Sequence, residues 1–487
     1  MANNNKGVLV LYTGGTIGSV PKDPNDPNSP RIIASWEMLR KAVPVLTTIG
    51  FKVDAYSFDP PIDSSNMKPE YWVEMAEVIE KNYDDYEGFV IVHGTDTMVY
   101  TASVLSFMLE NLEKPVIVTG SQIPIAGNAR NDGEQNLVTA LLIANPAFSG
   151  LSIVPEVCIY FSDKLLRGNR TQKESASGYT GFVTPNYPEL GEAGEYIVIH
   201  EEHIRKPTGR AFTVHKKLDT NVVPVLVFPG IHTTTIFETM FNADDVKAFV
   251  LETYGTGNAP TDDDFLDVIA KATAKDKIVL NVTQCPIGKV ELGLYETSAR
   301  MLDRNVVSGS DITRESALCK LMVLLGNEDL RTTEVREKVE TNLAGEQSVS
   351  IYTAAFDEKG NIKGEDRYRF RGEEVAVGWT PQKLSKALVR LRESSVATKE
   401  SEVIEFMVFF GLSGDAKPDT TKTNYAGTFV KQAKNDDNML VFDVTSTVRA
   451  LVSPDPGTKT SFTIVVKTKD ADVKWKRAEL VFFTNER

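Results

Sequence analysis

Cysteine and histidine are scarce in this chain. Its 487 residues include three cysteines, at positions 158, 285 and 319, and five histidines. The cysteines are odd in number and form no CxxC pair, so neither a disulfide framework nor a cysteine zinc site is predicted. A reducing compartment fits this usage.

Long apolar runs and an excess of positive charge are also lacking. No apolar stretch approaches the roughly 18 residues of a membrane-spanning helix. The opening MANNNKGVLVLYTGG does not have the layout of a secretory signal, a charged segment followed by a long apolar run and a cleavage site. The formal net charge of −14 argues against a nucleic-acid backbone or an anionic membrane as main partner. We therefore expect a cytoplasmic protein with no nucleic-acid and no membrane partner.

The first part of the chain alternates between two kinds of pattern. Short apolar runs at 7–12, 88–92, 115–119 and 156–161 each lead into a polar loop, and helical patterns cover 69–81 and 101–112. Such alternation indicates a parallel sheet covered by helices on both faces. Ligands of such sheets bind at the carboxyl ends of the strands, and we expect the functional site there.

The length predicts about three domains, at roughly 100–200 residues each. We expect a first α/β domain at 1–205, a polar connector at 206–220 and a second α/β domain at 221–349. In the second, 222–228 and 277–282 are predicted as strands, and 243–250 and 261–274 as helices. A connecting segment at 350–401 is expected to hold a helix from Pro381 to Glu393. Strand patterns dominate 402–487 and predict a β-sandwich-like module.

Two motifs follow predicted strands. In Thr13-Gly14-Gly15-Thr16-Ile17-Gly18 the paired glycines permit a tight turn against a ligand, and a hydroxyl held there could act as a nucleophile. A plain turn or a phosphate cradle is the alternative. In His93-Gly94-Thr95-Asp96-Thr97 a hydroxyl and a carboxylate sit at one strand end. Asp96 as a helix cap and His93 as a structural residue are the alternatives.

Two further motifs are polar. Arg167-Gly168-Asn169-Arg170-Thr171-Gln172-Lys173 follows a predicted strand, so Lys173 could reach the same crevice and transfer protons. The alternative is a solvated basic face. Asp63-Ser64-Ser65-Asn66-Met67 precedes Pro69 and could simply cap a helix.

Taken together, these motifs resemble the L-asparaginase family, especially its cytoplasmic type. The likeness covers roughly residues 6–345. It rests on TGGTIGS at 13–19, DSSNM at 63–67, YDDYEGFVIVHGTDTM at 83–98, YTASVLSFMLENLEKPVIVTGSQIP at 100–124, RGNRTQK at 167–173, YGTGNAP at 254–260 and NVTQC at 281–285. It implies a two-domain asparaginase fold, hydrolysis of L-asparagine without a metal or organic cofactor, and a homodimer or homotetramer.

The resemblance also implies roles for single residues. Thr16 corresponds to the nucleophile, and Thr95, Asp96 and Lys173 to the family's second catalytic group. Ser64 and Ser65 match positions that hold the ends of the substrate, with Asp96 pairing its amino group. Asn258 matches a position presented to the neighbouring subunit's site, although a turn asparagine is the simpler interpretation of the residue alone.

The sequence departs from the family at two places. The loop 20–31 contains no tyrosine, whereas the family has one there that hydrogen-bonds the nucleophile. At the family's second asparagine site, where an effector binds, Glu252 and Thr253 replace an expected arginine. A carboxylate at that position would repel the carboxylate of the effector.

Two other functions fit the same motifs. A tRNA-dependent amidotransferase subunit shares the core and releases ammonia for transfer, but the acidic charge disfavours tRNA docking. A non-catalytic amino-acid binding protein is the second alternative. In the module at 402–487, YAGTF and MLVFDVTSTV faintly resemble the C-terminal β-domain of plant polyphenol oxidases, but all five histidines lie upstream of it.

Overall fold

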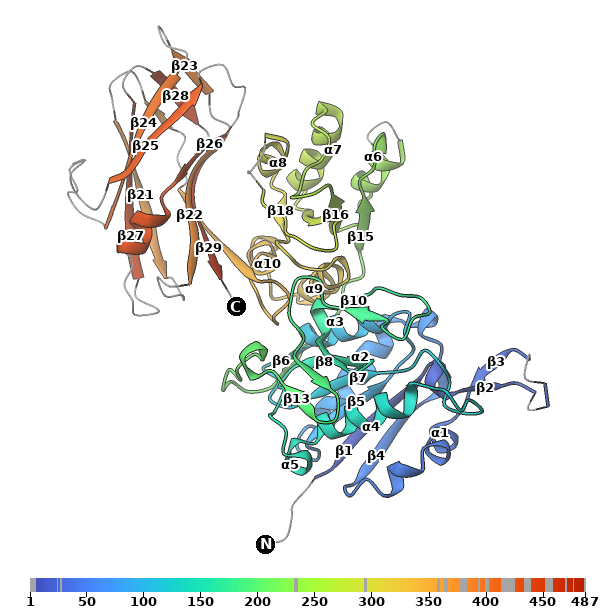
Figure 1. Ribbon diagram of the computed structural model, residues 1–487. Helices are drawn as coiled ribbons and strands as arrows, with labels where there is room; N and C mark the ends of the chain where they lie inside the picture. The colour runs from blue at the N-terminus through green and yellow to red at the C-terminus, as the bar shows by residue number, and fades with distance from the viewer. Residues whose placement is uncertain are drawn as a thin grey trace.

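Two α/β units and a β-rich unit follow one another along the chain in the computed structural model (Figure 1). The structure describes residues 6–23, 25–26, 29–231, 235–292, 296–356, 360–362, 367–376, 383–392, 395–398, 403–412, 425–432, 439–451, 459–468, 471–475 and 477–485. Within these ranges, no helix is both long and apolar enough to cross a membrane.

The first unit is built on an eight-stranded sheet of order β13-β12-β9-β8-β7-β5-β1-β4. The parallel strands are β4 (Val53–Ile62), β1 (Val8–Gly14), β5 (Gly88–Val92), β7 (Val116–Thr119) and β8 (Val157–Phe161). Strands β9 (Lys164–Arg167), β12 (Gly191–Ala193) and β13 (Ile197–Ile199) continue it antiparallel. The predicted parallel sheet is confirmed, with an antiparallel edge that the sequence patterns did not reveal.

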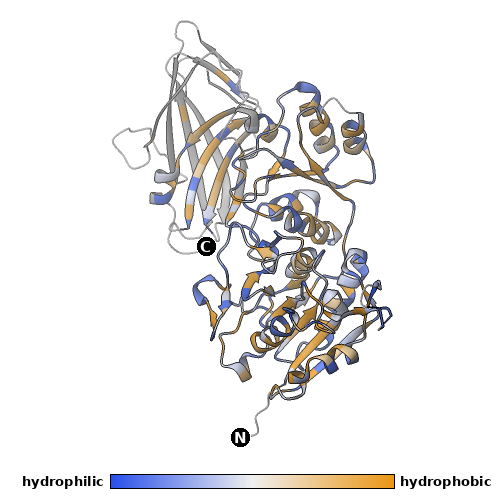
Figure 2. Cartoon of the chain, turned by 45° about the vertical axis from the view of Figure 1, so that its right-hand side comes forward, coloured by the Kyte–Doolittle hydropathy of each residue, from blue (hydrophilic) through white to orange (hydrophobic). Residues whose placement is uncertain are grey.

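Helices cover both faces of this sheet. Side chains alternate along a strand, so Leu9 and Leu11 of β1 pack with α2 (Pro69–Lys81) and α3 (Met98–Met108), whereas Val8 and Val10 pack with α1 (Trp36–Ala42) and α4 (Gly133–Ala144). The central strands are therefore apolar throughout, as Figure 2 shows. The predicted bounds of α2 are confirmed, while α3 begins three residues and ends four residues earlier than expected, because Leu109–Glu110 forms the short strand β6.

The second unit has a parallel sheet of order β15-β16-β17-β18. Its strands are β15 (Val222–Leu226), β16 (Ala248–Thr253), β17 (Ile278–Thr283) and β18 (Val307–Ser308), and its helices are α6 (Thr235–Asn242), α7 (Asp263–Ala274), α8 (Glu296–Leu302), α9 (Arg314–Gly326) and α10 (Thr332–Val339). The helix predicted at 243–250 is wrong, because its last residues open β16. That strand is buried on both faces, and a short apolar run of this kind cannot be told from a buried helix by its pattern.

The β-rich unit contains antiparallel sheets. One has the order β19-β29-β22-β26 and another β21-β27-β24-β25, while β20-β28-β23 forms a smaller sheet. Their bounds are β19 (Val349–Phe356), β20 (Gly360–Ile362), β21 (Arg367–Ala376), β22 (Leu384–Arg392), β23 (Ser395–Thr398), β24 (Val403–Leu412), β25 (Tyr425–Gln432), β26 (Met439–Asp443), β27 (Lys459–Thr468), β28 (Ala471–Trp475) and β29 (Arg477–Asn485). The two four-stranded sheets lie against each other (Figure 1), which agrees with the sandwich-like module that the sequence predicts.

The helix predicted from Pro381 to Glu393 is wrong in its described part, because 384–392 forms strand β22 between β29 and β26. Leu384, Ala387, Leu388 and Leu391 have helical spacing, which explains the error. A register irregularity between Leu384 and Lys386 shifts the alternation, and burial on both faces hides the rest of it.

Strands also occupy much of the expected connecting segment 350–401. Strand β19 pairs with β29, and β23 pairs with β28, so the described part of this segment contributes to the sheets of the β-rich unit. The strand expected over MLVFDVTSTV ends at Asp443, where the Asp443 carboxylate accepts a hydrogen bond from the Thr445 amide and α11 (Thr445–Leu451) begins. Independent folding of the module remains a prediction.

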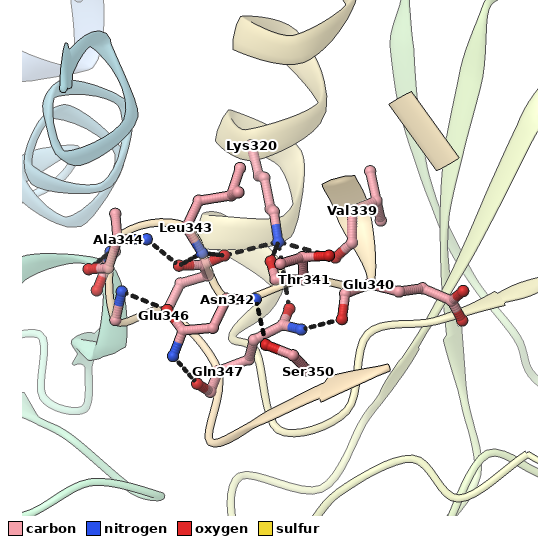
Figure 3. A network of polar contacts seen from close by, with 12 residues as sticks. Lys320, Val339, Glu340, Thr341, Asn342, Leu343, Ala344, Glu346, Gln347 and Ser350 are labelled. Carbon is pink, nitrogen blue, oxygen red and sulfur yellow. Dashed lines mark hydrogen bonds and ion pairs between the residues drawn. The ribbon is translucent and has the colours of Figure 1, made fainter. Parts of the chain in front are cut away.

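A buried polar network fixes the junction before the β-rich unit (Figure 3). Lys320 of α9 donates from Nζ to the carbonyls of Val339, at 2.8 Å, and Thr341, at 2.6 Å. It also pairs with Glu346 at 2.6 Å, and both side chains are fully buried. Burial opposes ionisation of Glu346, but Lys320 and two backbone N–H donors offset it and leave the pKa of this carboxyl below its usual value.

Candidate active site

The loop after β1 requires glycine. Gly15 has φ +91°, and a Cβ atom built on it would lie 2.5 Å from the backbone nitrogen of Gly94. Only glycine permits both this conformation and this approach. Thr16 follows at the start of a short 3-10 helix, Thr16–Gly18, and stays half-buried.

The loop after β5 makes a second close approach. A Cβ atom on Gly94 would lie 2.5 Å from Oγ of Ser64. Ser64 is buried, and its carbonyl oxygen accepts a 2.8 Å hydrogen bond from Oγ1 of Thr97. The loops that carry Thr16, Thr95 and Ser64 therefore meet at the carboxyl end of the sheet, where the sequence predicted a site.

Lys173 reaches this place from a fourth loop. Its Nζ atom donates to Oγ1 of Thr95 at 3.0 Å and to Oδ1 of Asp96 at 2.7 Å. The Lys173 side chain is 20% exposed and that of Asp96 is 66% exposed, so the hydroxyl and amine are sheltered while the carboxylate faces solvent. This arrangement can bind an ammonium group at Asp96 and relay protons through Lys173 and Thr95.

Ser65 lies beside Ser64 but is exposed. Its backbone nitrogen and Oγ both donate to Oδ1 of Asp63, at 2.9 and 2.7 Å. The capping role that the sequence left open for this loop is thus filled by Asp63, which caps the 3-10 helix Ser64–Asn66.

Asn258 is the one predicted site residue on the second α/β unit. It lies in a turn after β16 whose ends are joined by a bridge between Tyr254 and Asn258. The other candidates lie on the first unit, and the role that the resemblance implies for Asn258 is at the site of a second copy.

Sequence reasoning missed the residues that hold the Lys173 loop. Asn169 and Arg170 are fully buried and donate to the carbonyls of Ala344, at 2.8 Å, and Gly345, at 2.7 Å. Arg170 also forms a 2.9 Å ion pair with Asp311. The loop 167–173 is therefore not the solvated basic face that was the alternative interpretation. Its two arginines could have indicated that the loop is fixed by buried polar contacts.

Ile17 was also missed. Its carbonyl accepts a 3.2 Å hydrogen bond from the amide of Ile125, in the loop after β7, and thereby ties the Thr16 loop to a fourth strand end. Asp132 caps that loop by accepting from the amides of Gln122 and Ile123.

His93 is structural. It is fully buried, with Nδ1 2.6 Å from the carbonyl of Gly94 and Nε2 2.9 Å from Oγ1 of Thr101. Burial lowers its pKa to about 4, so the ring is neutral near pH 7 and holds the turn from β5 into α3.

The loop without a tyrosine starts and ends in a hairpin of β2 (Ser19–Pro21) and β3 (Arg31–Ile33), which projects from the first unit (Figure 1). Pro24, Pro27 and Asn28 lie outside the described residues. Tyr12 is the tyrosine nearest to Thr16 in the sequence. Its hydroxyl donates a 2.7 Å hydrogen bond to the carbonyl of Ala34. This hydrogen bond ties the Tyr12 hydroxyl to the base of the hairpin, just after β3.

Glu252, at the expected effector site, faces an arginine. Its carboxylate lies 3.5 Å from Nη1 of Arg314 on α9, and the side chain is nearly buried. Arg314 thus offsets part of the charge that was expected to repel an effector.

Within the described residues, no cluster of three or more His, Cys, Asp or Glu side chains could hold a metal ion.

Comparison with known proteins identifies the family to which the chain belongs. The model Asparaginase, N-terminal matches residues 7–205, and the Glutaminase/Asparaginase C-terminal domain matches residues 221–338. L-asparaginase 1 of Escherichia coli strain K12 is 41% identical over 350 residues, which are 70% of this chain and 98% of that relative. The chain belongs to the asparaginase family. As a member of this family it is an amidohydrolase, and the β-rich unit lies beyond both matched models.

Other proteins show the same core. The crystal structure of L-asparaginase I from Vibrio cholerae superposes with a TM-score of 0.63 at 39% identity and covers 71% of this chain and 99% of that one. A glutamyl-tRNA(Gln) amidotransferase component from Pyrococcus abyssi is 32% identical over 358 residues, 71% of this chain and 77% of that relative. The family's core therefore also occurs in a tRNA-dependent enzyme.

Proposed function

We propose that this chain hydrolyses L-asparagine to L-aspartate and ammonia, with Thr16 as nucleophile. One observation carries the proposal: the glycine-lined loop of Thr16 meets the loops of Ser64 and Thr95, and Lys173 is hydrogen-bonded to both Thr95 and Asp96. The likeness to relatives such as L-asparaginase 1 supports asparagine as the substrate.

The proposed reaction has two halves. Oγ1 of Thr16 attacks the side-chain amide carbon and forms a tetrahedral oxyanion. Backbone N–H groups in the glycine loops stabilise it, and each such donor is worth about 10²–10³ in rate. The C–N bond then breaks, and the leaving nitrogen takes up the proton that the Thr16 hydroxyl has lost and departs as ammonia. Water, activated through Thr95 and Lys173, attacks the acyl-enzyme and releases aspartate, so the sum is asparagine plus water to aspartate plus ammonia.

The substrate's other end has complementary partners. Asp96 is exposed beside the nucleophile loop and suits the α-ammonium group, while Ser64 supplies a hydroxyl donor for the α-carboxylate. The Ser65 hydroxyl, which donates to Asp63 without substrate, would turn to the substrate when it binds. Asn258 completes the site from a neighbouring copy in a homodimer or homotetramer. We place the enzyme in the cytoplasm, as the resemblance to cytoplasmic asparaginases suggests.

An assay of ammonia and aspartate released from asparagine tests the proposal. Thr95→Val and Lys173→Met should lose nearly all turnover, because groups that act as a unit are non-additive. Lys81→Met, on the exposed end of α2, is the matched control and should keep normal turnover.

Asparagine should be preferred to glutamine, although one methylene is worth only about 1–3 kcal/mol. Equal kcat/KM for the two amides would refute the preference.

The ammonia assay and a pull-down together separate the alternatives. A tRNA-dependent amidotransferase subunit would be retained with tRNA or a partner chain in a pull-down, and a binding protein would release no ammonia. The proposal expects steady ammonia release from the chain alone and no retention of tRNA.

A further inference from the structure

Ser19 is buried close to Thr16 and binds the backbone on both sides of it. It opens strand β2 and is 8% exposed. Its N–H donates to the carbonyl of Thr16, and its hydroxyl donates to the carbonyl of Gly15 at 3.3 Å. The Gly15 carbonyl also accepts from the amide of Gly18 at 3.2 Å. One residue therefore holds the carbonyls of both peptide groups that flank Thr16.

The direction of the Thr16 N–H depends on the Gly15 carbonyl. A peptide group is planar and trans, so its carbonyl and its N–H point in opposite directions. The Gly15 carbonyl and the Thr16 N–H belong to one peptide group, and fixing the first fixes the second. Among the hydrogen bonds of the described residues, none has the Thr16 N–H as donor. This N–H is thus available to an oxygen of a substrate.

The rest of the Thr16 loop is fixed by packing. Ile17 is fully buried, and a Cβ atom built on Gly18 would lie 2.1 Å from the hydroxyl oxygen of Tyr12. Within the described part of the chain, Ser19 supplies the only side chain that hydrogen-bonds the Gly15 carbonyl. Removing its hydroxyl should therefore act on this peptide group and leave the packing of the loop in place.

The orientation of this peptide group matters for the proposed reaction. When Oγ1 of Thr16 attacks the side-chain amide of asparagine, the amide oxygen becomes an oxyanion, and preorganised N–H donors stabilise that state. In serine hydrolases the N–H of the nucleophile residue is one of these donors. A peptide group that has to reorient in each turnover costs free energy in the transition state rather than in substrate binding, so kcat falls while KM stays.

We propose that Ser19 is a positioning residue for this reaction, which holds the Gly15–Thr16 peptide group so that the Thr16 N–H points at the oxyanion. The inference rests on the proposed function, because it needs Thr16 as the nucleophile. Ser19 acts through the Gly15 carbonyl and leaves the donor itself in place. Its loss should therefore cost less than the factor of about 10²–10³ that follows the removal of a whole donor.

Steady-state kinetics of Ser19→Ala with asparagine test the proposal. The value of kcat should fall about three- to tenfold, as the loss of one neutral hydrogen bond predicts. KM and inhibition by the product aspartate should stay unchanged. Ser106→Ala is the matched control, because the Ser106 hydroxyl also donates to the carbonyl four residues earlier, that of Ala102 at 2.7 Å, but within α3. A wild-type kcat for Ser19→Ala, or a loss that appears in KM alone, would overturn the proposal.

Two further variants separate the hydroxyl from the size of the side chain. Ser19→Thr and Ser19→Val have nearly the same shape, and both residues suit a strand, but only threonine keeps a hydroxyl. Ser19→Thr should turn over asparagine about three- to tenfold faster than Ser19→Val. Equal kcat values for this pair would contradict the proposal even if Ser19→Ala fails to fold.

NMR of the full chain labelled with [15N]threonine provides a measurement that needs no turnover. The Thr16 amide signal is identified by its absence in Thr16→Ala. Ser19→Ala should shift this signal, because the hydrogen bond at the Gly15 carbonyl polarises the shared peptide group, whereas Ser106→Ala should not. An unshifted signal in Ser19→Ala would overturn the inference about Ser19. Turnover by folded Thr16→Ala would instead overturn the proposed function, so the two failures are distinguishable.

Discussion

Arg170 and Asp311 form a buried ion pair of 2.9 Å, although 141 residues separate them in the chain. Arg170 belongs to the loop that ends in Lys173, and Asp311 precedes α9 of the second unit. Burial opposes ionisation of Asp311, but the guanidinium of Arg170 offsets it and leaves the pKa of the carboxyl below its usual value. The loop of the first unit that carries Lys173 is thus anchored on the second unit.

Replacing Asp311 by asparagine should destabilise the protein. The variant keeps the size of the side chain but leaves a buried guanidinium without its charge partner, which costs about 3–5 kcal/mol. Urea unfolding measures the loss, and asparagine turnover should fall with it because Lys173 loses its support. Arg331→Ala, which breaks the exposed pair with Glu334, is the control and should change little. Equal effects of the two variants would contradict the anchor.

A chain that ends at Ser350 should fold and keep its activity. It retains Ala344, Gly345 and Glu346, whose contacts hold Asn169, Arg170 and Lys320. A chain that ends at Lys338, where the matched family model ends, lacks them and should unfold at lower temperature. Thermal unfolding, ammonia release and light scattering compare the two. A folded but inactive chain ending at Ser350 would show that the β-rich unit contributes to the site.

Stability should fall as pH rises from about 4.5 to about 7. Burial raises the pKa of Glu340 in the folded state to about 7, against an ordinary value of 4.5, so in this window the folded protein holds a proton that the unfolded chain has released. The free energy of unfolding decreases through the window and then levels. Glu340→Gln should match the wild type at pH 5 and exceed it at pH 8 by on the order of 2 kcal/mol in urea unfolding. Parallel pH profiles for the two proteins would contradict this assignment.

Activation by asparagine at a second site should be absent. Glu252 stands where a carboxylate-binding arginine was expected, and Arg314, at 3.5 Å, is paired with it. Initial rates against asparagine concentration should therefore follow a hyperbola. A sigmoidal curve that Glu252→Arg leaves unchanged would mean that an effector binds through other residues.

The sequence predicted that several candidate residues lie at one edge of the sheet, because the determinants of that placement are local. Buried parallel strands appear as continuous apolar runs, and each run ends in the loop that carries a candidate residue. Thr95 and Lys173 were therefore assigned to one edge of the sheet, where their 3.0 Å hydrogen bond lies. The close approach of Gly15 to Gly94 has the same origin, since β1 and β5 are neighbours.

The parts that could not be predicted depend on distant partners. Nothing near Arg170 identifies Asp311, because this contact joins units far apart in sequence. Strand β22 was taken for a helix since its apolar residues are spaced as in a helix and its pairing with β29 is not local. Periodicity resolves a strand only where one face is exposed.

The most direct test of the proposed mechanism is the release of ammonia from L-asparagine by Thr16→Ala. The variant removes one hydroxyl from a half-buried position, so circular dichroism and thermal unfolding should match the wild type. Turnover should fall by about 10³-fold or more, whereas Thr16→Ser, which keeps a hydroxyl, should retain measurable turnover. If folded Thr16→Ala releases ammonia within about tenfold of the wild-type rate, Thr16 is not the nucleophile and the proposed mechanism is wrong.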